Sequence, residues 1–200
     1  MISGLPESAV VNQQLPKKAV YEKFGLTGQE KSRFDQSIHK MAIVAEVSPK
    51  TVNIAPGADV KSFFVIEVML QSRRYDRKSI EMLFKLIEQN IVLILRHKDQ
   101  CRLVVFKGML IEGDWFDADL LSFDLRGIDL DVTWENLIKA VGKIEVSGET
   151  TLEDQIRIDA EQNKIRLQID ILERKMRSEK QPRVKRELYG TIQNLKEKLI

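Results

Sequence analysis

The pattern of apolar and polar positions is clearest between Ser62 and Phe106. Phe63–Leu70 is almost continuously apolar, which predicts a strand buried on both faces. Asp76 then precedes apolar side chains at the spacing of one helical face. Ile91–Leu95 and Cys101–Phe106 are two further apolar segments joined by a polar turn. The stretch therefore predicts a βαββ unit, with a parallel crossover followed by an antiparallel hairpin.

The segment before this unit predicts two helices and one strand. Pro16 favours the start of a helix over Lys17–Phe24. Thr27 followed three residues later by a glutamate has the spacing of a capping box, and predicts a second helix to about residue 40. Met41–Val47 is rich in β-branched residues and predicts a strand, and Thr51–Ile54 is expected to be a short extended piece.

The segment after the βαββ unit predicts an edge strand over Leu120–Leu125 and a helix capped by Thr133 that runs to Val141. Residues 142–150 contain two glycines and predict a boundary. The fold class is therefore α/β (α+β): a mixed sheet with flanking helices and a C-terminal antiparallel helical hairpin. We expect an α/β body over residues 1–146 and a hairpin arm over residues 147–200.

The last fifty residues have the periodicity of paired helices. Apolar residues in the first half predict a seam of the coiled-coil type, formed by Ile158, Ile165, Ile169, Leu172 and Met176. Pro182 ends that helix. A second seam follows, formed by Leu188, Ile192, Leu195 and Leu199. Two such helices are expected to fold back on each other and to offer a surface to a partner helix or to a second copy of the chain.

Composition narrows the class of protein. The chain is 43% hydrophobic and 31% charged, and no apolar run is long enough to cross a membrane. A single cysteine, Cys101, excludes an internal disulfide and agrees with a cytoplasmic location. The net charge of +2 conceals blocks of opposite sign, since residues 108–135 hold eight acids and one arginine.

Catalytic signatures are absent from the sequence. There is no phosphate-binding glycine loop, and the two histidines, His39 and His97, lie far apart, so we expect no metal and no cofactor. One enzymatic alternative is a divergent metal-dependent nuclease using Asp59 and Glu67, because a βαββ core often carries such carboxylates. Met69, however, stands where a lysine would be needed to activate water.

Two groups of cations are candidate sites for nucleic acid or for an acidic partner. The first lies at the predicted start of the central helix and consists of Arg73, Arg74, Arg77 and Lys78, with Tyr75 available for stacking. The second surrounds the predicted turn of the arm and includes Arg174, Lys175, Arg177, Lys180, Arg183, Lys185 and Arg186. Solvated surface charge is the alternative interpretation of both groups.

Several short motifs resemble an uncharacterised bacterial domain family of about this length. They are Leu5-Pro6, Asn12, Pro16-Lys17, Val52-Asn53-Ile54, Lys180-Gln181 and Arg186-Glu187-Leu188, together with the central strand–helix–strand–strand order. Members of that family are often encoded beside helicases and DNA methyltransferases in phage-defence clusters. The resemblance implies an accessory role near DNA-processing machinery, with a protein partner such as a helicase, and it carries over no catalytic residue.

The leading functional hypothesis is a non-enzymatic accessory or adaptor subunit that binds a partner protein through its C-terminal hairpin, with no membrane association. The divergent nuclease is one alternative. The other is a self-associating structural protein in which the arm forms the interface of a homo-oligomer. Salt-dependent binding of DNA, metal-dependent nicking and oligomeric state distinguish the three.

Overall fold

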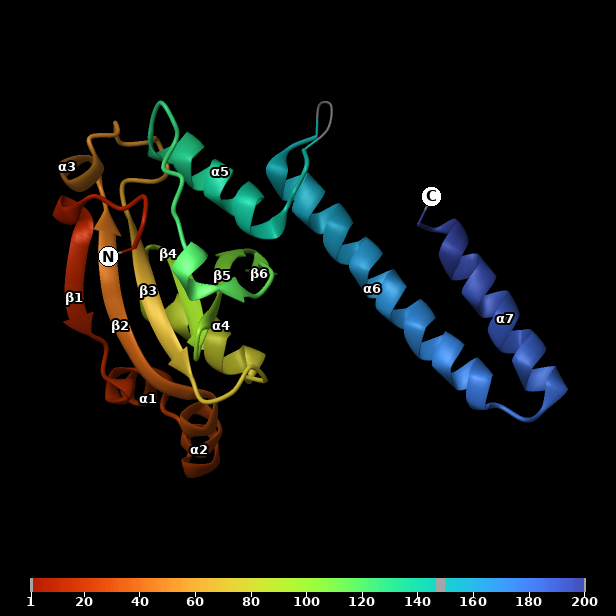
Figure 1. Cartoon of the computed structure of the whole chain (residues 1–200). Coiled ribbons are helices and arrows are strands. Elements are labelled where there is room, and N and C mark those ends of the chain that lie inside the picture. Colours follow the sequence, from red (N-terminus) through yellow and green to blue (C-terminus); the bar gives the residue numbers. More distant parts are fainter. Residues whose placement is uncertain (1, 147–149, 200) are drawn as a thin grey trace. The chain divides into compact units, whose positions relative to one another are not determined.

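The computed structural model describes residues 2–146 and 150–199, and these divide by their contacts into two units, residues 1–144 and 145–200. The first unit is a mixed α/β body and the second is a pair of helices (Figure 1). The chain therefore has the mixed α/β class that the sequence predicts. The predicted boundary segment, 142–150, includes residues 147–149, which lie outside the described residues.

A seven-stranded sheet forms the centre of the body, in the spatial order β1-β2-β3-β4-β5-β6, with β7 paired to β5. Its strands are β1 (Val10–Gln14), β2 (Ile38–Val47), β3 (Phe63–Leu70), β4 (Asn90–His97), β5 (Gln100–Lys107), β6 (Met109–Glu112) and β7 (Phe116–Asp117). Among these, β3 and β4 pair in parallel and the other pairs are antiparallel. The sheet thus contains the predicted βαββ unit, extended by strands on both sides.

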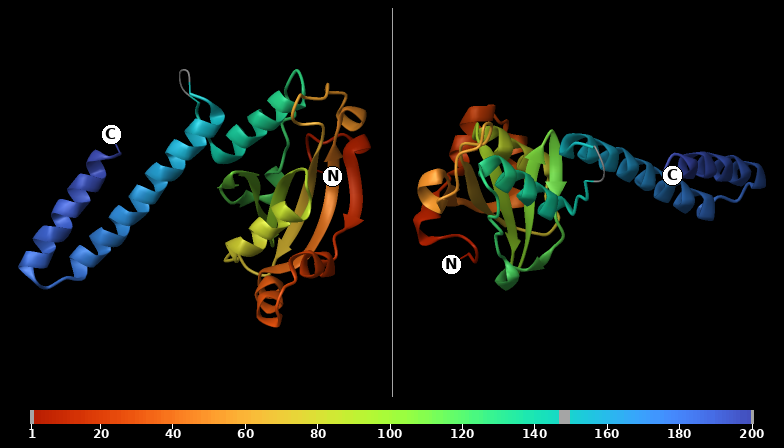
Figure 2. Two further views of the ribbon diagram at one scale, coloured as in Figure 1. Left: turned by 180° about the vertical axis from the view of Figure 1, so that it is seen from behind. Right: turned by 90° about the horizontal axis from the view of Figure 1, so that it is seen from above.

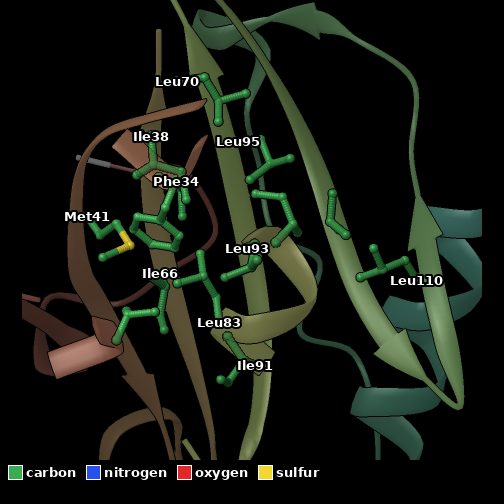
Figure 3. Packing of buried hydrophobic residues seen from close by; sticks show 14 of the residues in the cluster. Phe34, Ile38, Met41, Ile66, Leu70, Leu83, Ile91, Leu93, Leu95 and Leu110 are labelled. Carbon is green, nitrogen blue, oxygen red and sulfur yellow. The ribbon is translucent and has the colours of Figure 1, made fainter. Parts of the chain in front are cut away.

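Helices cover both faces of this sheet (Figures 1 and 2). The body's helical segments are η1 (Glu7–Ala9), α1 (Lys17–Phe24), α2 (Gly28–Ser37), α3 (Pro49–Val52), α4 (Arg77–Leu86), η2 (Ala118–Leu120) and α5 (Leu130–Gly142). On one face, α1, α2 and α4 enclose a core that includes Ile66 and Leu93 (Figure 3). On the other, α5 packs its Trp134 ring 5.2 Å from the ring of Phe63. The result is a three-layer arrangement with β3 and β4 buried at its centre.

Local sequence signals explain several of these elements. The predicted capping box is present: the Thr27 hydroxyl accepts the Glu30 N–H, and the Glu30 carboxylate accepts the Thr27 N–H at 2.9 Å. Asp76 caps α4 through the N–H of Ser79 at 3.1 Å. Because these caps need only neighbours in the sequence, the starts of α2 and α4 fall where the pattern predicts them.

Four local predictions are wrong. The second helix ends at Ser37, and β2 begins at Ile38. The expected extended piece at residues 51–54 lies partly in α3, a helical turn at whose start the Thr51 hydroxyl accepts the Ser48 N–H at 2.9 Å. Thr133 lies inside α5, which Asp129 caps.

The fourth wrong prediction is the edge strand at Leu120–Leu125. This segment contains the end of η2 and a single bridge between Ser3 and Ser122. Its alternating pattern arises from irregular backbone that buries Leu121 and Phe123 while their neighbours face solvent. The alternation of apolar and polar residues in this segment therefore reflects which side chains are buried, although the segment does not form a strand.

Loop 57–60 is tied to the first turn of α5 by one carboxylate. Asp131 accepts the N–H groups of Ala58 and Val60, each at 2.6 Å. These backbone hydrogen bonds, chiefly that from Val60, hold the pKa of Asp131 below its usual value. Gly57 is required beside it, because a Cβ at this position would lie 2.1 Å from an Asp131 oxygen.

The second unit consists of α6 (Leu152–Ser178) and α7 (Pro182–Glu197), which pack together as a helical pair (Figure 1). The Thr151 hydroxyl caps α6 by accepting the N–H of Asp154 at 3.2 Å, with acidic residues in the first turn where the helix dipole favours them. Pro182 is the first residue of α7, a position that needs no backbone donor.

Candidate functional site

The packing of α6 on α7 uses residues of both predicted seams. Ile169 on α6 and Leu188 and Ile192 on α7 are buried. The half-buried members of the two seams are Ile165, Leu172, Met176, Leu195 and Leu199. Ile158, at the start of the predicted seam, is 41% exposed. The apolar pattern thus identifies the residues that the helical pair brings inward, with the exception of this N-terminal position.

The turn between these helices, residues 174–186, is called the basic turn below. It holds seven cations and one carboxylate, Glu179. That carboxylate accepts the N–H groups of Lys180 at 2.8 Å and of Gln181 at 2.9 Å, and these two backbone bonds, that of Gln181 first, lower the pKa of Glu179. The acid therefore stabilises the turn itself.

The carboxylates on either side of the basic turn are also engaged. Glu187 pairs with Arg183 at 3.2 Å, and Glu173 pairs with Lys196 at 3.0 Å. Among the described residues, the remaining cations of the turn form no salt bridge and are exposed; they are Arg174, Lys175, Arg177, Lys180, Lys185 and Arg186. A dense group of solvated cations with no salt-bridge partner can approach a polyanion without first breaking internal ion pairs.

The other predicted cluster, Arg73, Arg74, Arg77 and Lys78, is called the α4 shoulder. Arg73 stacks over the Trp115 ring, with its guanidinium carbon 5.0 Å from the ring centroid. Arg77 lies 3.4 Å from a Glu112 oxygen. The Asp76 side chain already accepts the Ser79 N–H at the N-terminus of α4, so one of the backbone donors that could bind an anion there is occupied by the chain's own carboxylate. Arg74 and Lys78 are exposed and form no salt bridge within the described part of the chain.

A network that the sequence did not reveal lies beneath the α4 shoulder. The Tyr75 hydroxyl donates to Glu112 at 2.8 Å, and Arg102 donates to the Tyr75 oxygen at 3.1 Å and to the Gly113 carbonyl at 2.8 Å. Burial, reinforced by Glu112, raises the pKa of Tyr75 to about 12. Arg102 also faces the Trp115 ring, with its guanidinium carbon 5.5 Å from the centroid.

This network spans four segments of the chain. Tyr75 precedes α4, Arg102 lies on β5, Glu112 ends β6 and Trp115 follows it. The hydrogen bond from Arg102 to Tyr75 joins residues 27 apart in the sequence, and the bond from Tyr75 to Glu112 joins residues 37 apart. The β5–β6 hairpin brings Arg102 and Glu112 together. Tyr75 is consequently a structural residue whose hydroxyl is engaged, in contrast to the free stacking ring that the cluster of bases predicts.

The carboxylates of the nuclease alternative lie apart. Glu67 is in the middle of β3 and accepts from Arg96 on β4 at 2.9 Å. Asp59 is exposed in the loop held by Asp131, before the start of β3. Four residues of strand, about 13 Å, lie between the start of β3 at Phe63 and Glu67, and Asp59 precedes that start by four residues in the sequence. Within residues 2–146 and 150–199, no three His, Cys, Asp or Glu side chains are grouped as metal ligands would be.

Cys101 pairs with Arg96 across β4 and β5 and is fully buried. Burial raises the pKa of its thiol, which disfavours the reactive thiolate. Nor, in the described ranges, is any helix both long enough and apolar enough to span a bilayer.

Comparison with known sequences places the chain in a family. Residues 4–199 match the family described as a domain of unknown function, DUF4391. The chain belongs to this family, which confirms the expected membership in an uncharacterised domain family of about 200 residues. No curated protein and no solved structure matches the chain significantly.

Proposed function

We propose that the protein is a non-enzymatic accessory subunit that binds a partner protein through its C-terminal helical pair and works beside DNA-processing machinery. The basic turn contacts the phosphate backbone of the nucleic acid on which the partner acts. The resemblance to a family encoded near helicases and methyltransferases, in phage-defence clusters, supports this setting.

The observation that carries the proposal is the state of the charges in the basic turn. Its cations project from the end of a helical pair, and the neighbouring carboxylates of Glu173, Glu179 and Glu187 are all engaged. The α4 shoulder has a similar sequence pattern, but Arg73 and Arg77 are held by Trp115 and Glu112. Phosphate contact is therefore assigned to the basic turn.

The test is the salt dependence of duplex DNA binding by the full chain. Each phosphate contact contributes about 0.9 to the slope of log affinity against log salt. Changing Lys180, Lys185 and Arg186 to Ala is expected to lower that slope by up to about 2.7 and to weaken binding at low salt. A matched control changes three exposed lysines of the body, Lys40, Lys50 and Lys85, to Ala, and removes the same charge.

An equal loss of DNA affinity in the two triple variants would show that binding depends on net charge alone, and would contradict a site at the basic turn. Failure of the unaltered chain to bind DNA even at low salt would end the nucleic-acid part of the proposal. Incubation of plasmid with Mg²⁺ tests the enzymatic alternative: nicking that needs the metal and disappears in Glu67→Ala would overturn the non-enzymatic role.

A further inference from the structure

Helix α6 carries apolar residues on two opposite faces. Ile169 is 6% exposed, in the packing against α7, whereas Leu167 and Ile171 are each 64% exposed. Residues two positions apart on an α-helix are rotated by about 200°, so Leu167 and Ile171 lie nearly opposite Ile169. They are four residues apart and share one face with each other.

This second face continues along α6. Leu152 and Ile156, which are buried, and Ala160, which is half-buried, precede Leu167 and Ile171 at intervals of four, four and seven residues. That is the spacing of a packing stripe, and a helix that only had to pair with α7 would need one such stripe. This stripe is buried at its N-terminal end, and its exposed part, at Leu167 and Ile171, has the pattern of a surface that binds another helix.

Positive charge flanks the exposed part of this stripe. Lys164 lies one turn before Leu167, while Arg174 and Lys175 lie one turn after Ile171. None of these three cations forms a salt bridge in the part of the chain that the structure describes. Asp170 is the acid on this face between Lys164 and Lys175, which are about three turns apart.

The charges argue against pairing of this face with a second copy. An antiparallel copy that set Leu167 against Ile171 would also set Lys164 against Arg174, because both pairs are centred on the same position. A parallel copy in register would set Lys164 against Lys164 and Lys175 against Lys175. Like charges at flanking positions destabilise helix pairs, whereas acidic flanks on the other helix would stabilise them.

We propose that the face of α6 formed by Leu167 and Ile171 binds an amphipathic helix of a partner protein whose apolar stripe is flanked by Asp or Glu. The proposal rests on the accessory role proposed above and names the surface and the chemistry of its partner. The partner helix inserts its apolar residues between Leu167 and Ile171, and its acids pair with Lys164, Arg174 and Lys175.

The test uses two synthetic helical peptides and the full chain. Both peptides have Leu at the two core positions of each heptad; one has Glu at every flanking position and the other has Lys. Like charges keep each peptide from pairing with itself. The Glu peptide is expected to bind in a fluorescence-anisotropy titration, and the Lys peptide at least about tenfold more weakly.

Changing Leu167 and Ile171 to Ser is expected to weaken binding of the Glu peptide at least about tenfold. The control changes two exposed apolar residues of the body, Leu120 and Ile128, to Ser and is expected to leave binding unchanged. Because all four side chains are exposed, circular dichroism of both variants should match that of the unaltered chain.

Three results would overturn the proposal: no binding of the Glu peptide, equal binding of the two peptides, or equal binding by the Leu167/Ile171 variant. Sedimentation showing a dimer that this variant dissociates would assign the face to self-association and overturn it as well. The DNA experiment changes Lys180, Lys185 and Arg186, which lie outside this stripe. Loss of DNA binding with retained peptide binding, or the reverse, therefore separates this inference from the proposed nucleic-acid contact.

Discussion

The α4 shoulder and the basic turn look alike in the sequence but differ in what surrounds their cations. At the shoulder, β5 and β6 bring Trp115, Glu112 and Arg102 against the basic residues, so charge there is part of the packing of the body. At the basic turn, the neighbouring acids have partners of their own and six cations remain without a salt bridge among the described residues. A run of basic residues in the sequence therefore predicts a binding surface only when the side chains that surround it in the fold are also known.

The largest expected effect is on the shoulder's central ring. Trp115→Ala removes a half-buried indole together with its contacts to Arg73 and Arg102. It is expected to lower the free energy of unfolding of the body by about 2–3 kcal/mol, below the value for a fully buried tryptophan. Urea unfolding followed by the fluorescence of Trp134, the second of the two tryptophans, measures the change.

Arg74→Ala is the control for this measurement, since Arg74 is exposed and belongs to the same shoulder. It is expected to change the free energy of unfolding by less than about 0.5 kcal/mol. A small effect of Trp115→Ala would mean that the shoulder is as loosely held as the basic turn, and the distinction between the two regions would fail.

A smaller, pH-dependent effect is expected at Tyr75. Burial and Glu112 raise the pKa of Tyr75 to about 12 in the folded chain from an ordinary value of 10.0. Its protonated form is favoured by folding, so its contribution to stability is complete below pH 10 and is lost as the pH rises to about 12. After allowance for solvent screening, the contribution is about 1–2 kcal/mol.

Tyr75→Phe isolates this contribution because it keeps the ring and removes the titrating group. The difference in unfolding free energy between the unaltered chain and this variant should shrink between pH 10 and 12. Tyr21, whose pKa burial and Asp35 also raise to about 12, is present in both proteins and cancels in the comparison. A constant difference across that range would show that the Tyr75 hydroxyl is not held as described.

The smallest expected effect is on the stability of the helical pair. Lys180, Lys185 and Arg186 are exposed and form no salt bridge with any described residue, so changing all three to Ala should alter the free energy of unfolding by less than about 0.5 kcal/mol in total. Thermal unfolding followed by circular dichroism measures this. Marked loss of helix would show that these residues maintain the turn, and weaker DNA binding by the variant could then not be attributed to lost phosphate contacts.

Sequence reasoning succeeded where structure depends on near neighbours. The cap of α2 by Thr27 and Glu30 and the nearly continuous apolar run of β3 identify themselves locally. In contrast, β1 was missed, since Val10–Gln14 is a mostly exposed edge strand with three polar residues, and only pairing with β2 makes it a strand. The short β6 was also missed. It is defined as a strand by its pairing with β5, through a hairpin that turns at Gly108, where φ is 71°.

The candidate sites follow the same rule. The basic residues are visible in the sequence, but the network of Tyr75, Arg102 and Glu112 depends on strand register, which no local pattern encodes. The second stripe of α6 could have been found, since Leu167 and Ile171 follow helical spacing. The stronger seam through Ile169 concealed it.

The carboxylate of Asp131 also bears on how quickly the chain reaches its native state. Its bonds to Ala58 and Val60 close a loop of more than seventy residues. Contacts so distant along the chain slow folding, because the entropy of the intervening segment must be lost before they form. The helical pair, built from neighbouring residues, should form orders of magnitude sooner. A full chain refolding from the denatured state would therefore present its basic turn before its body is complete.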